Sequence, residues 1–119
     1  MTNLADVFQE LRAMMVPFAR QLDCTIDRAD ELYVNTHHMQ ANRKPLWFGG
    51  VQIKKRYVSY HLMPVYVNPA LLEGISPGLK KRMQGKSCFN FTSSDPLLFE
   101  ELAALTEASF MDYQEKGYV

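Results

Sequence analysis

The feature that most constrains this chain is the alternation of apolar and polar side chains in the run YVSYHL, residues 57–62. Alternate residues of a β-strand point to opposite faces, so Val58, Tyr60 and Leu62 are expected to share one face of a sheet. This β-rich run continues through MPVYV to Val67. In the β-rich runs at residues 31–38, 46–54 and 86–92, the apolar sets Leu32/Val34, Val51/Ile53 and Phe89/Phe91 each keep one parity. The predicted core face is Leu32, Val34, Val51, Ile53, Val58, Tyr60, Leu62, Phe89 and Phe91.

Two amphipathic segments lie outside these runs and predict helices. Asn3 can cap the first, whose apolar residues recur every three or four positions up to Leu22, although Pro17 is expected to kink or interrupt it. Asp95 and Pro96 can start the second, and Gly117 can end it.

Two proline-started helical turns are expected between the third and fourth strands. They are NPALLEG, capped by Asn68, and SPGLKKRMQG, capped by Ser76. The whole pattern predicts one α+β domain over residues 1–119. It has two layers, with an antiparallel sheet of about four strands packed on one face by the N- and C-terminal helices.

Charge is unevenly distributed along the chain, although the formal net charge is zero. Residues 43–86 hold nine basic residues and one acid, Glu73, so this window is +8 and the remainder is −8. Two interpretations stay open: a soluble domain with a charge dipole, or a basic surface for an anionic ligand.

The location predicted from the sequence is the cytoplasm. The N-terminal residues lack the pattern of a signal peptide, and no apolar run approaches the ~20 residues that span a bilayer, so no membrane association is expected. Cys24 and Cys88 form no CxxC motif and are expected to be reduced thiols.

The alternate positions of the same β-rich runs are expected to form the other face of the sheet. This face is polar and aromatic, and no helix is expected to cover it. Its expected members are Tyr33, Asn35, His37, Phe48, Gln52, Tyr57, Ser59, His61, Cys88 and Asn90. The candidate ligand-binding residues are His37, Tyr57, Ser59, His61, Cys88 and Asn90. Such a face can hold a small ligand or a protein partner, a homodimer included, or it can be the half-solvated side of an antiparallel sheet.

Motifs for common chemistries are absent from the sequence: it has no GxSxG, GxxxxGK[ST], HExxH or GxGxxG. Cys88 would need a thiolate favoured by Lys86 and a base, His61, to act as a nucleophile. A shared face for His37, His61 and Cys88 permits a metal site without requiring one. No catalytic or metal-binding residue is assigned. No cofactor is expected, with iron kept as the alternative.

The segments VSYHLMPVY, LKKRMQGKSCFNF and the closing amphipathic helix resemble the YdhG-like domain family, a broad bacterial group of small domains of unknown function. The resemblance covers Glu31 to Gly117 and implies a small α+β domain with a helix-backed antiparallel sheet. Some members are linked to a frataxin-like iron-chaperone role, which depends on clustered acids. The acidic residues of the N-terminal segment that could serve such a role are Asp6, Glu10, Asp23, Asp27, Asp30 and Glu31.

The leading hypothesis from the sequence is a non-enzymatic binding module that uses the helix-free sheet face. The alternatives are a frataxin-like iron-binding chaperone and a thiol- or histidine-dependent enzyme. Nucleic acid is not an expected partner, because the chain as a whole has no net positive charge.

Overall fold

A five-stranded antiparallel sheet forms the centre of the structure, a computed structural model that describes residues 3–119. The strands follow one another in space as in sequence: β1 (Asp23–Asp27), β2 (Glu31–Met39), β3 (Pro45–Ile53), β4 (Val58–Leu62) and β5 (Cys88–Phe91). The predicted α+β class is confirmed, with five strands instead of about four. The added strand is β1, whose sequence DCTID is mostly exposed and lacks the apolar alternation that marks the others.

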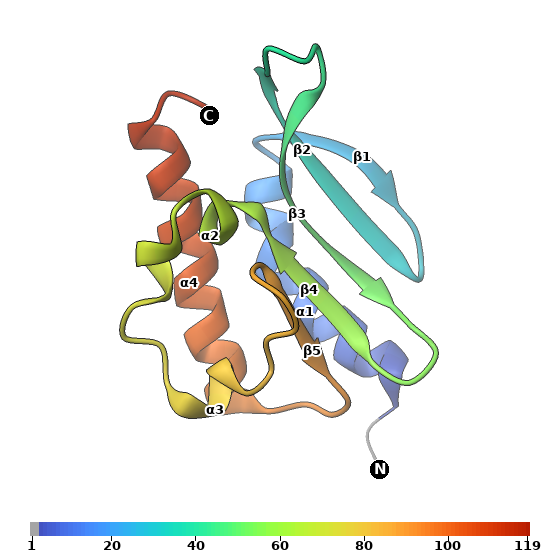
Figure 1. Cartoon of the computed structure of the whole chain (residues 1–119). Helices are drawn as coiled ribbons and strands as arrows, with labels where there is room; N and C mark the ends of the chain where they lie inside the picture. Colours follow the sequence, from blue (N-terminus) through green and yellow to red (C-terminus); the bar gives the residue numbers. More distant parts are fainter. Residues whose placement is uncertain (1–2) are drawn as a thin grey trace.

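Two long helices cover one face of this sheet, as predicted. In Figure 1, α1 (Leu4–Ala19) crosses behind the strands, and α4 (Pro96–Glu115) lies beside it. The predicted caps are formed, since Asn3 Oδ1 accepts from the Asp6 amide at 2.8 Å and Asp95 Oδ1 from the Leu98 amide at 3.2 Å. Pro17 does not interrupt α1, which continues for two more residues to Ala19.

The connection from β4 to β5 consists of three short helices: α2 (Met63–Val67), η1 (Pro69–Leu72) and α3 (Pro77–Lys80). The caps predicted at Asn68 and Ser76 are present. The segment MPVYV was predicted to continue the β-rich run to Val67, but it forms α2 instead. Pro64 fits the first turn of a helix, where its missing N–H costs nothing, and this context overrides the β-propensity of valine and tyrosine.

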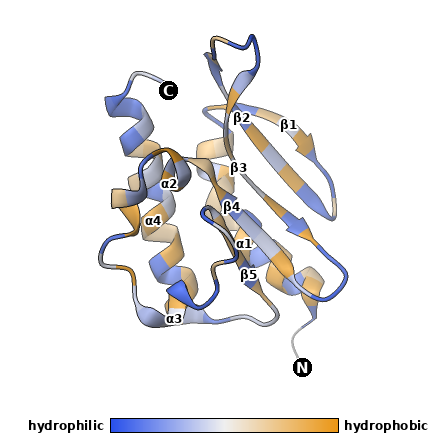
Figure 2. Cartoon of the chain, viewed as in Figure 1, coloured by the Kyte–Doolittle hydropathy of each residue, from blue (hydrophilic) through white to orange (hydrophobic). Residues whose placement is uncertain are grey.

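The predicted core face is confirmed. Along β2, Figure 2 shows apolar and polar residues alternating, as expected for a strand with one buried face. Leu62 and Phe89 are both 0% exposed, and Tyr60 is equally buried, with its hydroxyl 2.7 Å from Thr106 Oγ1 of α4. The parity read from the sequence therefore holds for β2, β4 and β5.

Phe48 contradicts the predicted parity. It was expected on the helix-free face, but it is fully buried, with its ring centroid 6.1 Å from those of Phe110 and Tyr113 in α4. The cause is a β-bulge: Val34 pairs with Gly49, and Asn35 pairs with Trp47, so Phe48 has no partner on β2. Trp47 takes the place on the helix-free side instead.

Candidate functional site

One row of residues crosses the helix-free face of the sheet. Tyr33 of β2 pairs with Gly50 of β3, Gly50 pairs with His61 of β4, and His61 pairs with Cys88 of β5. Directly opposed residues on neighbouring strands point to the same side, so these side chains form a line across four strands. We refer to Tyr33, Trp47, His61, Cys88 and Asn90 as the cross-strand row, because the contacts below join them.

Aromatic rings form the first half of the cross-strand row. The ring centroids of Tyr33 and Trp47 are 5.2 Å apart with an interplanar angle of 13°, and those of Trp47 and His61 are 5.3 Å apart at 39°. The indole N–H of Trp47 donates to the Gly49 carbonyl at 2.9 Å, which fixes the ring. The spacing of the rings is close to the ~4.8 Å between strands, so the three rings stand side by side across the sheet.

Polar contacts form the second half. His61 Nε2 lies 3.5 Å from Cys88 Sγ, and the Cys88 thiol donates to Asn90 Oδ1 at 3.3 Å. The side-chain amide of Asn90 in turn donates to Gln84 Oε1. All of these row residues are half-buried, so they are ordered by their neighbours while still open to a ligand.

The electrostatics keep both members of the His61–Cys88 pair neutral. Burial raises the pKa of the Cys88 thiol above its ordinary value, and the nearby Lys54 charge only partly opposes this. Burial also lowers the pKa of His61, and Lys54 lowers that pKa further. A neutral thiol beside a neutral imidazole is a hydrogen-bonding pair, unlike the thiolate that nucleophilic catalysis requires.

Lys86 does not have the role that the sequence suggested for it. Its ammonium lies 6.0 Å from the centroid of the Tyr66 ring, and the cation whose charge acts on Cys88 is Lys54. Lys86 lies in the bend at residues 85–87, directly before β5.

The predicted site residues are only partly brought together. His61, Cys88 and Asn90 are in direct contact. Ser59 lies in the next row, between Gln52 and Asn90, and is 1% exposed. Tyr57 is half-buried and lines a hollow that Asn90 also lines.

His37 does not join the cross-strand row. It is exposed and lines a separate hollow of about 360 Å³ with His38 and the C-terminal residues Gly117, Tyr118 and Val119. The ring of His38 lies 4.6 Å from that of Tyr118. Trp47 and Gln84 belong to the site and were missed. The run WFGGV has no apolar–polar contrast that would have placed Trp47 on this face.

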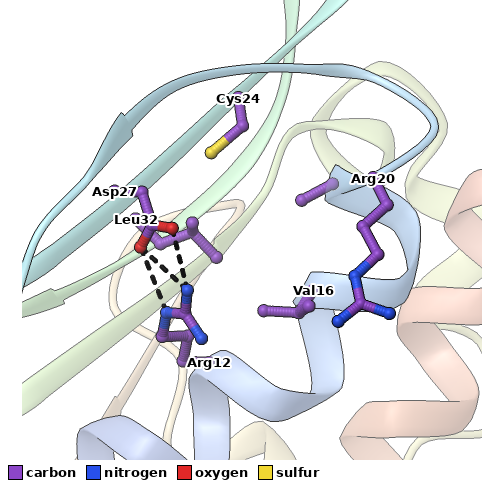
Figure 3. Close-up of a pocket in the computed structure, with 7 residues that line it drawn as sticks. Arg12, Val16, Arg20, Cys24, Asp27 and Leu32 are labelled. Carbon is purple, nitrogen blue, oxygen red and sulfur yellow. Dashed lines mark hydrogen bonds and ion pairs between the residues drawn. The ribbon is translucent and has the colours of Figure 1, made fainter.

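Another hollow lies on the helix-covered side of the sheet, between α1 and the strands β1 and β2 (Figure 3). It measures about 310 Å³, and its lining includes the apolar residues Val16 and Leu32. Arg12 donates to both carboxylate oxygens of Asp27 at 2.9 Å. This ion pair occupies one of the acids that an iron-binding role would use.

The other acids named for iron do not form a ligand cluster. Within residues 3–119, no three histidine, cysteine, aspartate or glutamate side chains are grouped so that they could hold a metal ion. Cys24 and Cys88 are both free thiols. Over the same residues, no helix has the length and apolar character needed to cross a bilayer.

Comparison of the chain with protein-family models, curated proteins and solved structures finds no match. The resemblance to the YdhG-like domain family therefore stays a prediction from the sequence.

Proposed function

We propose that this protein is a non-enzymatic binding module of the cytoplasm, in which the helix-free sheet face holds a small ligand or a partner chain. The observation that carries the proposal is the cross-strand row, a continuous line of half-buried aromatic and polar side chains. Binding sites combine aromatic anchors with a few polar groups that fix orientation, and this row has both. The two free thiols support a reducing location.

Rigidity of the row also supports binding. Trp47 is held by its hydrogen bond to Gly49 and by rings on both sides, so a ligand that contacts it orders few additional rotamers. Cys88 and Asn90 are held in the same way, because the Cys88 thiol donates to Asn90 Oδ1 and the Asn90 side-chain amide donates to Gln84. A face prepared in this manner differs from an ordinary solvated sheet surface, whose polar side chains are free.

Native mass spectrometry of freshly purified protein tests the proposal. We expect a retained small molecule or a dimer, and we expect His61→Ala and Tyr57→Ala to lose it while their circular dichroism melts stay close to the parent's. His38→Ala is the matched control, because this histidine packs on Tyr118 away from the row. The proposal is contradicted if every sample contains only the monomer without ligand, and if no compound of a small-molecule fragment collection changes the fluorescence emission of Trp47. Unfolding of both His61→Ala and Tyr57→Ala would also contradict it, since the face would then belong to a core.

A thiol-dependent enzyme is the second candidate, and the 3.5 Å contact between His61 Nε2 and Cys88 Sγ is the observation that favours it. The raised pKa of Cys88 argues against it. The rate at which Cys88 is alkylated distinguishes the two functions.

A further inference from the structure

A basic hollow adjoins the cross-strand row at its β5 end. It measures about 390 Å³, and the residues that line it include Tyr57, Lys81, Arg82, Gln84, Asn90 and Thr92. Asn90 belongs to both the hollow and the row, because its side chain accepts from the Cys88 thiol. A ligand on the row can therefore extend into the hollow without leaving the protein surface.

Backbone hydrogen bonds fix the wall that carries the positive charge. The backbone N–H of Asn90 donates to the Arg82 carbonyl at 2.8 Å, and the backbone N–H of Gln84 donates to the Cys88 carbonyl at 2.9 Å. Met83 forms a β-bridge with Phe89 between these two bonds. Residues 82–84 thus run along the outer edge of β5, and the positions of Arg82 and Gln84 are as well defined as those of a strand.

The charge of this hollow is positive and uncompensated. Lys81 and Arg82 line it, and no carboxylate does. Within residues 3–119 the ion pairs are Arg12–Asp27 and Lys116–Asp112, so neither Lys81 nor Arg82 has an acidic partner. Tyr57 and Thr92 add hydroxyl groups that can donate hydrogen bonds. The complementary ligand group is an anion.

We propose that the hollow binds the anionic group of a small molecule, such as a phosphate, sulfonate or carboxylate, while the uncharged part of that molecule lies on the cross-strand row. This inference rests on the proposed function and names the chemical class of its ligand. A small molecule is favoured over nucleic acid because only two cationic side chains, Lys81 and Arg82, line this hollow of about 390 Å³, and the chain as a whole has zero net charge.

The test uses two fluorescent probes that differ in one anionic group: 8-anilinonaphthalene-1-sulfonate and the uncharged N-phenyl-1-naphthylamine. We expect the parent protein to bind the sulfonate about tenfold more tightly, as a charge-assisted contact allows. Lys81→Gln with Arg82→Gln should abolish this preference. The pair Arg43→Gln and Lys44→Gln, in the turn between β2 and β3, is the matched control and should retain it.

A charge-preserving exchange, Lys81→Arg with Arg82→Lys, separates charge from packing and should keep most of the preference. Equal affinity for the two probes, or a preference that the Gln variants leave intact, overturns the anion site. If both probes bind and His61→Ala weakens both, the proposed function stands even though the anion site fails. If neither probe binds the parent protein, both proposals fail. Tight binding of a ten-residue oligothymidylate that displaces the sulfonate overturns the small-molecule assignment in favour of nucleic acid.

Discussion

Trp47 covers Gly50: the Cζ2 atom of its indole ring lies 3.6 Å from the position that a Cβ on Gly50 would occupy. The ring fills the space that the glycine leaves between Tyr33 and His61, so the aromatic line continues across β3 although β3 has no side chain at that register position. The cross-strand row therefore depends on a glycine as much as on its aromatic residues.

Replacement of Gly50 by alanine should disturb both the sheet and the row. The new Cβ would lie 2.7 Å from the Leu32 carbonyl oxygen, a backbone atom that cannot move without shifting β2. We expect a loss of about 1–3 kcal/mol in the free energy of unfolding, measured by urea denaturation, with a red shift of the Trp47 emission. Gly78→Ala is the control: its Cβ would meet only the ends of flexible side chains, and the change should stay within about 0.5 kcal/mol. Similar small effects for both glycines would contradict the packing described here.

Truncation of the core face gives a second prediction. Leu62 and Phe89 are 0% exposed, so Leu62→Ala and Phe89→Ala should each lower the free energy of unfolding by about 2–5 kcal/mol, because each leaves a cavity under the helices. Leu97, which is 79% exposed, is the control, and its truncation should have little effect. A loss below half a kilocalorie per mole for both core variants would show that the sheet faces are inverted.

The parity of β4 and β5 was predictable because these strands pair without a bulge. Val58 opposes Phe91, and Tyr60 opposes Phe89, so each apolar residue meets another. In β3 the same reasoning assigned Phe48 to the wrong face. The bulge that turns Phe48 inward arises from its pairing with β2, and the local run WFGGV contains no apolar–polar contrast that would reveal it.

The functional site was predictable to the extent that it follows parity. His61, Cys88 and Asn90 were placed together from alternation alone, whereas Trp47 was missed because of the bulge. The cation that acts on Cys88 could not be chosen from the sequence either. Lys86 is nearer in the chain, but the fold brings the charge of Lys54 to Cys88 and places Lys86 over Tyr66. Long-range placement of this kind depends on sheet geometry and on the loop before β5.

The lowered pKa of His61 predicts how stability depends on pH. In the folded protein the pKa of His61 lies below its ordinary value of 6.5, so the unfolded chain binds a proton at this histidine more readily. The free energy of unfolding should therefore fall as pH decreases through about 6.5. The stability that neutral His61 contributes above this pH should be fully lost once the pH is below the folded-state pKa. Urea denaturation at several pH values between about 7.5 and 5 measures the slope. His61→Gln should flatten this slope, and equal slopes for the parent and His61→Gln would contradict the burial of the imidazole.

The two cysteines should differ in their reaction with iodoacetamide, and the difference tests the enzyme alternative. Cys88 is half-buried, donates its thiol proton to Asn90, and has a pKa raised by burial, so its thiolate is scarce at neutral pH. Cys24 also has a raised pKa, but it is exposed. We expect Cys88 to be alkylated more slowly than Cys24 and more slowly than a free thiol at pH 7, as followed by mass spectrometry of peptides.

His61→Ala provides the sharper comparison for the same reaction. If His61 serves only as a hydrogen-bonding neighbour, its removal opens space beside Cys88, and alkylation should be unchanged or faster. If His61 is a base that activates the thiol, the same change should slow alkylation. Cys24→Ser removes the competing signal and leaves the row intact. Alkylation of Cys88 much faster than that of a free thiol, together with slowing in His61→Ala, would replace the binding module with a thiol-dependent enzyme.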